Sequence, residues 1–233
     1  MLGVKNKLAR GETATMCLVN YTSPALVEQL ARVGFDVAMI DCEKGNASPR
    51  DIEDMCRAGR SAGIACIVRG WSGDPGLLSR YLDLGADGVM VAAVETPQAA
   101  KALAESVRYA RFKDWQDKLV IGMLESPKAI ADLPNLLAVE GIDVWFIGPN
   151  DLAHRMGMPG QGQHQAVWDL AESALRTIHA AGKIGGILAP KGRVPSLQAA
   201  GARLLLARSS ELLATGAQEF HSQLTPSDKG SRP

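Results

Sequence analysis

The sequence lacks the features that mark several large classes of protein. Its four cysteines have neither CxxC nor zinc-ligand spacing, which favours reduced thiols over disulfides or a zinc site. Its 25 basic and 25 acidic side chains balance without a long basic run, which argues against nucleic acid or an anionic membrane surface as the main partner. No apolar run approaches the roughly 20 residues of a membrane span, and the chain starts without an apolar signal core. We therefore expect a cytoplasmic chain.

Glycine-rich phosphate loops are also missing. The stretch CLVNYTSP after the first apolar run is not GxGxxG, and GxxxxGK[ST] does not occur, which argues against a doubly wound nucleotide-binding sheet. The 233 residues, 46% of them apolar, are enough for one large α/β domain or two small ones. No linker divides the chain. We predict one domain over residues 1–225 and a disordered polar tail over 226–233.

Short apolar runs alternate with amphipathic stretches, a pattern typical of a parallel sheet with crossover helices. Prolines fall near helix starts and glycines near helix ends, as helix termini favour. Eight such units in a chain close to the ~250 residues of that fold predict a (β/α)8 TIM barrel. The predicted strands are 13–19, 35–41, 64–69, 88–93, 119–124, 142–147, 184–188 and 203–207. The predicted helices are 24–33, 49–62, 76–84, 97–111, 127–139, 166–181, 193–200 and 210–224.

Two acidic residues stand at the ends of two successive buried runs, Glu125 in VIGMLES and Asp151 in VWFIGPNDL. A carboxylate beside such a run is paired, protonated or bound to a cation, because an unpaired buried charge is very costly. Two carboxylates on neighbouring strand ends can share one hard divalent ion and leave positions for water and substrate. The alternative is a pair of helix N-caps, since a helical pattern follows each acid.

Barrel enzymes carry their chemistry at the carboxyl ends of the strands. The second predicted strand delivers Asp41, Glu43 and Lys44 there, and the third delivers Arg69. An arginine that ends an apolar strand needs an anionic partner, and its fork matches a carboxylate or an enolate. The alternative is a salt bridge from Arg69 to one of the neighbouring acids that only organises the barrel mouth.

These strand ends lie in stretches that resemble the HpcH/HpaI family, metal-dependent class II pyruvate aldolases. The resemblance runs from about residue 8 to residue 213, and GID-x-x-FIGP-x-DL is its most specific part. The matching stretches are IDCEK, VR, LDLGADGVMVAAVET, LES, GIDVWFIGPNDLA and GKIGGILA.

The resemblance implies a divalent metal, usually Mg²⁺, Mn²⁺ or Co²⁺, held by Glu125 and Asp151. It implies that Arg69 binds the keto oxygen of pyruvate or its enolate. We assign further substrate contacts to Glu43, Gly148 and Pro149 at the strand ends. The resemblance also implies a homo-oligomer, a hexamer or trimer of dimers, in which paired subunits exchange the last helix.

The chain departs from the family at three places. The family motif IDxEH ends in a histidine that works with the preceding aspartate as acid and base, whereas this chain has Asp41 and Lys44. Gly70 and Trp71 replace the family proline after the arginine, and a Pro-rich stretch before the fifth strand is missing. Lysine is a poor base at neutral pH unless it is desolvated. Lys44 is therefore either a salt-bridged or solvated loop residue, or a general acid or electrostatic clamp in catalysis.

The sequence thus favours a metal-dependent carbon–carbon lyase that acts on a small 2-oxo acid through a pyruvate enolate. The same electron sink serves oxaloacetate decarboxylation and a citrate-synthase-like condensation, which remain alternatives. A non-catalytic barrel that binds an oxo acid is a further alternative, and the replacement of the family histidine is the feature that favours it.

Overall fold

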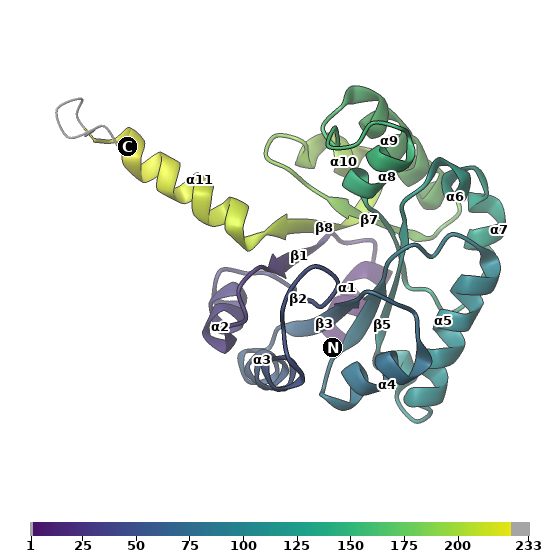
Figure 1. Cartoon of the computed structure of the whole chain (residues 1–233), viewed down its shortest axis with the longest axis horizontal. Coiled ribbons are helices and arrows are strands. Elements are labelled where there is room, and N and C mark those ends of the chain that lie inside the picture. Colours follow the sequence, from purple (N-terminus) through teal and green to yellow (C-terminus); the bar gives the residue numbers. More distant parts are fainter. Residues whose placement is uncertain (1, 225–233) are drawn as a thin grey trace.

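The computed structural model describes residues 2–224 and has the predicted (β/α)8 barrel architecture (Figure 1). Eight parallel strands pair in chain order, and the barrel closes where the last strand pairs with the first. The tail predicted over 226–233 lies outside the described residues. The strands are β1 (Ala14–Val19), β2 (Val37–Asp41), β3 (Ala65–Gly70), β4 (Gly88–Val91), β5 (Leu119–Leu124), β6 (Val144–Ile147), β7 (Ile184–Leu188) and β8 (Ala202–Arg208).

The helices surround this barrel, and one of them leaves it (Figure 1). They are α1 (Leu2–Ala9), α2 (Pro24–Arg32), α3 (Pro49–Ala62), α4 (Pro75–Asp83), α5 (Pro97–Ala110), α6 (Pro127–Ala131), α7 (Leu133–Leu137), α8 (Pro149–Arg155), α9 (Gln165–Ala180), α10 (Val194–Ala199) and α11 (Ser209–Ser222), with a short 3₁₀ turn at Trp115–Asp117. No helix within residues 2–224 is long and apolar enough to cross a membrane.

The strands are continuous apolar runs because both of their faces are buried. Along β1, Met16 and Leu18 pack inside the barrel, whereas Cys17 packs outward among the helices. The interior is filled by side chains, and Gly186 of β7 leaves the space that Phe146 of β6 needs. A Cβ at Gly186 would lie 2.7 Å from the Phe146 ring. The barrel is therefore a packed core whose free space lies at its ends.

Four helices begin at prolines that the sequence analysis placed at helix starts, namely Pro24, Pro49, Pro97 and Pro127. In each case the residue before the proline is a serine or threonine. Its hydroxyl accepts a hydrogen bond from a backbone N–H in the first helical turn. Proline supplies the helical φ and has no N–H that would stay unused at that position. These local signals fix where each crossover helix turns back along the barrel.

An aspartate stands immediately before β2, β4 and β6 and ties each of these strands to the preceding one. The carboxylates of Asp36, Asp87 and Asp143 accept hydrogen bonds of 2.7–2.9 Å from the backbone N–H groups of Thr15, Cys66 and Val120. Each bond satisfies a backbone donor at the amino end of a strand, where the ladder begins. The bonds therefore set the register of three strand pairs at the end of the barrel away from the predicted site.

Helix α1 covers this amino-terminal end of the barrel and was not predicted from the sequence. Val4 and Leu8 are buried against the barrel, and Lys5 and Lys7 form ion pairs with Asp143 and Asp36. Among the α1 side chains whose burial is described, only Val4 and Leu8 are apolar and buried, and this pattern is too short to indicate a helix. Its position depends on contacts with strands far along the chain.

Two further helical segments differ from the prediction. The helix predicted over 127–139 is divided into α6 and α7 at Asp132. Pro134 has no N–H to bond back to the preceding turn, which accounts for the break. The short helix α8 follows β6 directly, with Gly148 before its first residue and Pro149 as that residue. Asp151 therefore lies in the first turn of a helix rather than in a loop.

Helix α11 projects away from the barrel at the carboxyl end of the described chain (Figure 1). Of its residues only Ser209 is buried, and Leu212, Leu213 and Phe220 expose 47%, 65% and 64% of their surface. Large exposed apolar side chains such as these are typical of a surface that contacts another protein. The homo-oligomer with an exchanged last helix stays a prediction.

The aspartates at the strand starts generate a stability prediction. Asp143→Ala should lower the free energy of unfolding by about 1–3 kcal/mol, because the Val120 N–H would lose its acceptor while staying buried. Urea denaturation followed by circular dichroism measures this. Glu105→Ala, which removes an exposed carboxylate 3.8 Å from Lys101, is the control and should change stability by less than about 0.5 kcal/mol. Equal stabilities of the two variants would contradict the assigned role of Asp143.

Candidate active site

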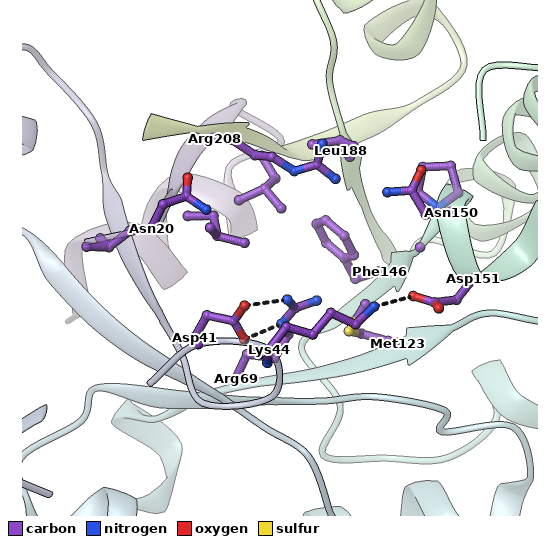
Figure 2. A pocket seen from close by; sticks show the side chains of 16 residues that line it. Asn20, Asp41, Lys44, Arg69, Met123, Phe146, Asn150, Asp151, Leu188 and Arg208 are labelled. Atoms are coloured by element: carbon purple, nitrogen blue, oxygen red, sulfur yellow. Dashed lines mark hydrogen bonds and ion pairs between the residues drawn. The ribbon is translucent and has the colours of Figure 1, made fainter. Parts of the chain in front are cut away.

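A cavity of about 290 Å³ opens at the carboxyl ends of the strands (Figure 2). This volume lies at the small end of the range for ligand pockets, so it suits a small molecule. Its floor is apolar and is formed by Leu18, Val19, Met123, Phe146, Leu188 and Leu206. Its polar lining residues are Asn20, Asp41, Lys44, Arg69, Asn150, Asp151 and Arg208, together with the backbone at Gly45, Gly148 and Pro149.

The predicted site residues come together at this cavity. Asp41, Lys44, Arg69 and Asp151 line it directly. The remaining two acids, Glu43 and Glu125, lie behind the lining. Glu43 pairs with Arg69, and Glu125 lies against Gly148.

Arg69 is held by two carboxylates from the end of β2. Its Nε and Nη2 donate to the two carboxylate oxygens of Asp41 at 3.0 and 2.7 Å, and its Nη1 lies 3.1 Å from Glu43 Oε2. Burial opposes ionisation of Asp41, but the hydrogen bonds and charge of Arg69 outweigh it, so the pKa of Asp41 lies below its ordinary value. The salt bridge considered for Arg69 is therefore present, and it fixes the guanidinium in one orientation.

Glu125 is the most unusual carboxylate of the site. It is only 4% exposed, its Oε2 accepts a hydrogen bond of 2.9 Å from the Ala93 N–H, and its Oε1 has no hydrogen-bond partner among the described residues. Burial raises the pKa of Glu125 to about 7, and the negative charges of Asp151 and Glu43 add to the shift. Ala93 adopts a φ of 52°, which is rare for a residue with a side chain, and thereby presents its N–H to Glu125.

Gly148, which directly follows β6, lies against Glu125. A Cβ at position 148 would lie 2.8 Å from Glu125 Oε1 and 3.3 Å from the Met123 side chain. Only glycine leaves the space beside this unpaired oxygen. Pro149 then starts α8 and sets the direction in which Asp151 is presented to the cavity. The two residues shape the site through their backbone.

Neither strand-end acid is a helix N-cap, so that alternative is wrong. Ser126, the neighbour of Glu125, caps α6 through a bond from the Ala129 N–H. Asp151 lies inside α8, whose N-cap position is Gly148. Neither carboxylate is therefore used to cap a helix.

Lys44 reaches across the cavity mouth to Asp151 (Figure 2). Its Nζ donates to Asp151 Oδ2 at 3.2 Å and lies 3.9 Å from Glu43 Oε1. From the sequence, Asp41 and Glu43 are the acids nearest to Lys44 along the chain. In the structure the Asp41 carboxylate pairs with Arg69, and Lys44 pairs instead with Asp151 of α8. The salt-bridged state of Lys44 is thus present in the structure, with its side chain 58% exposed.

The carboxylates fit a divalent cation as an incomplete ligand set. Within residues 2–224 no group of three or more His, Cys, Asp or Glu side chains is arranged to hold a metal ion. Mg²⁺ is commonly bound through one or two carboxylates, with waters and substrate oxygens completing its six ligands. The unpaired buried Oε1 of Glu125 and the carboxylate of Asp151, whose negative charge acts on Glu125, are hard oxygen donors of this kind.

Three polar residues of the cavity were missed from the sequence. Arg208 is the last residue of β8, one position beyond the predicted end of that strand, and Asn20 directly follows β1. Asn150 precedes Asp151 in α8. The signal for Arg208 was available, because a basic residue at the end of an apolar barrel strand is the same pattern that identified Arg69. Asn20 and Asn150 carry no such signal, since asparagine is common in turns.

Known proteins resemble this chain in sequence and structure. It is 31% identical over 208 residues to a hydroxypyruvate/pyruvate aldolase of Roseovarius nubinhibens, an alignment that covers 79% of this chain and 81% of the relative. It is 30% identical over 208 residues to a 2-keto-3-deoxy-L-rhamnonate aldolase of Shigella sonnei, covering 79% and 78% of the two chains. The crystal structure of an HpcH/HpaI aldolase/citrate lyase family protein from Burkholderia cenocepacia superposes with a TM-score of 0.86 at 25% identity, covering 95% of this chain and 99% of that one.

The family model for HpcH/HpaI aldolase/citrate lyase matches residues 14–218, which include every strand of the barrel and all the acids of the cavity. The resemblance inferred from the strand-end motifs is thereby confirmed over most of the chain. This protein belongs to the HpcH/HpaI aldolase/citrate lyase family.

Proposed function

We propose that this protein is a divalent-metal-dependent lyase that forms or breaks the carbon–carbon bond next to a pyruvate enolate. The observation that carries the proposal is the Glu125 carboxylate, which is buried at the barrel mouth, has an unpaired oxygen, and is acted on by the negative charge of Asp151. Burying such a group costs free energy unless a ligand repays it. The pyruvate-related names of the two aldolases described above support the choice of substrate class.

Glu125 and Asp151 would hold the cation on one side and leave its other positions to substrate oxygens and water. A divalent cation there would supply Lewis-acid polarisation of a 2-oxo acid. For it to bind, Asp151 must exchange part of its contact with Lys44, and Glu125 must be ionised. Gly148 gives the space beside Glu125 Oε1 in which a ligand can approach.

Arg69 would stabilise the negative charge that develops on the keto oxygen as the bond breaks. Its two contacts to Asp41 hold the planar guanidinium in place before substrate arrives, so little reorganisation is needed during the reaction. Asp41 and Glu43 are in this view positioning residues. Glu43 acts through Arg69, because it does not line the cavity.

Retro-aldol cleavage and oxaloacetate decarboxylation place different demands on the residue at position 44, which is Lys44. Retro-aldol cleavage must remove a proton from the substrate hydroxyl, and an ammonium group between Asp151 and Glu43 does not accept one. Loss of carbon dioxide from oxaloacetate needs no such base, because the breaking bond leaves its electron pair on the same enolate. The position of Lys44 therefore favours oxaloacetate decarboxylation as a second candidate reaction on the same site.

The metal site can be tested both by activity and by metal binding. EDTA should abolish activity and Mg²⁺, Mn²⁺ or Co²⁺ should restore it. Calorimetry should show Mn²⁺ affinity falling about tenfold per pH unit below pH 7, because a cation must displace the proton that Glu125 holds there. Above pH 7 the carboxylate is already ionised, so this dependence should flatten.

Glu125→Gln supplies the control for this titration. The amide cannot ionise, so the variant should bind Mn²⁺ weakly at every pH and lose the change in slope near pH 7. Asp151→Asn should also weaken binding but keep that change, since Glu125 remains. Full activity in a preparation shown to be free of divalent metal would refute the metal-dependent assignment.

The role of Arg69 can be tested by a substitution that keeps its charge but changes its hydrogen-bonding geometry. Arg69→Lys keeps the positive charge but loses the fork that bonds to Asp41 and to an enolate. We expect kcat to fall on the order of 10²-fold or more, with a smaller rise in KM, measured by coupling pyruvate release to lactate dehydrogenase. A variant that turns over normally but melts several degrees lower would show that the Arg69–Asp41 pair is only structural.

Lys44 is tested by two substitutions. If Lys44 is not the base, Lys44→Ala should reduce retro-aldol kcat by less than about tenfold, and Lys44→His should raise it by providing a base near Asp41. Oxaloacetate decarboxylation, measured in parallel, should be the faster reaction of the unaltered protein. Efficient cleavage of 4-hydroxy-2-oxo acids by that protein, together with a slower Lys44→His variant, would contradict this role.

A further inference from the structure

The cavity has a second polar end, formed by β1 and β8, to which the proposed reaction assigns no task. Arg208 ends β8 and Asn20 follows β1, and the two strands are paired with Leu18 opposite Arg208. Figure 2 shows the Arg208 guanidinium reaching over the cavity floor on the side opposite the Arg69–Asp41 pair. A cation carried on a barrel strand is held more rigidly than one on a loop.

Arg208 is the least neutralised of the cations that line the cavity. Arg69 lies between two carboxylates, and Lys44 pairs with Asp151 and lies near Glu43. Arg208 has one acidic partner among the described residues, Glu211, whose Oε1 accepts from Nη1 at 2.7 Å. Glu211 is 51% exposed, so water screens this pair, and the described residues leave Nε and Nη2 without a hydrogen-bond acceptor.

Asn20 adds an oriented donor to the same end. Its Oδ1 accepts from the Ser209 hydroxyl at 3.2 Å and from the Ser210 N–H at 3.1 Å, which ties it to the start of α11. Because the oxygen is occupied, the amide nitrogen is the free end, and Figure 2 shows that nitrogen on the cavity side. The β1–β8 end thus offers hydrogen-bond donors from both the Arg208 guanidinium and the Asn20 amide.

The floor between the two polar ends is apolar. Phe146, Leu188 and Leu206 line it, and in Figure 2 the Phe146 ring lies between Arg208 and the Lys44–Asp151 pair. A carbon chain suits this floor, while charged groups suit the ends. A ligand that matches the whole cavity therefore carries an oxo-acid group at one end and an anionic group at the other.

We propose that Arg208, assisted by Asn20, binds a carboxylate at the far end of the substrate, so that the enzyme selects 2-oxo dicarboxylic acids over 2-oxo acids with a neutral end. This inference rests on the proposed function for the placement of the first carboxylate near Glu125, Asp151 and Arg69. Arg208 is in this assignment a specificity-determining residue that takes no part in bond breaking.

Binding of two unreactive probes of equal chain length tests the assignment. In calorimetric titrations with Mn²⁺ present, 2-oxoglutarate should bind at least about tenfold more tightly than 2-oxopentanoate, since only the first has a second carboxylate for the guanidinium. Arg208→Met should reduce this preference below about threefold and leave 2-oxopentanoate binding within about twofold of its original value. Circular dichroism and melting temperature verify the fold of each variant.

Two matched variants sharpen the result. Glu211→Gln removes the acid that competes for Arg208, so it should keep or increase the preference for 2-oxoglutarate. Arg208→Lys retains the charge without the fork and should keep part of the preference, which a merely disturbed cavity would not do. The proposal is overturned if the unaltered protein binds both probes equally, or if Arg208→Met weakens both probes to the same degree.

A separate assay distinguishes this inference from the proposed function. Pyruvate release from 4-hydroxy-2-oxoglutarate and from 4-hydroxy-2-oxopentanoate is measured beside oxaloacetate decarboxylation. If none of the three reacts while the Arg208-dependent probe preference is present, the lyase assignment fails and the far-end carboxylate site stands. If the two 4-hydroxy acids react with equal kcat/KM and Arg208→Met lowers both equally, the lyase stands and the far-end site fails.

Discussion

Parallel pairing of eight strands into a closed cylinder is the constraint on which the rest of the structure depends. Closure places the carboxyl ends of all strands around one opening, so residues from β2, β3, β5, β6 and β8 meet although they are far apart in the chain. The interior is filled by side chains, which leaves space only at the ends. The aspartates at the amino ends of alternate strands and the cover provided by α1 hold the opposite end shut.

Most charged groups at the open end of the barrel pair with a group of opposite charge, because burying an unpaired ion is costly. Arg69 is enclosed by Asp41 and Glu43, and Lys44 is drawn to Asp151. Glu125 is left with an unpaired oxygen next to other negative groups, so its pKa rises to about 7. Glu125 is therefore the carboxylate of the site whose ionised form is most strongly opposed by its surroundings. A bound cation would remove that cost, and the family membership of the chain agrees with such a use of the site.

The cavity is asymmetric in its chemistry, and this asymmetry bears on substrate choice. One end combines acids with a fixed arginine, and the other offers Arg208 and the Asn20 amide above an apolar floor. Lys44 stands at the mouth of the acidic end, where it pairs with Asp151. A site with this layout separates two tasks. In the proposed reaction, residues near Glu125 would act on the bond that changes, whereas Arg208 would select substrates by the group at their far end.

The sequence by itself determined the barrel, its eight units, the helix starts at proline and the identity of the acids at the strand ends. These features follow from local rules, namely the length of apolar runs, the chemistry of helix caps and the position of a residue relative to the end of its strand. Arg69 and Asp151 were found for the same reason.

Only the tertiary structure decided which charged groups pair. Lys44 and Asp151 are 107 positions apart, and their contact depends on the curvature of the barrel and on how α8 starts after Gly148. The same holds for the unpaired oxygen of Glu125 and for the role of α1 as a cover. Pairing in space depends on strand register and on competition among neighbouring charges, and neither quantity is written in a local sequence pattern.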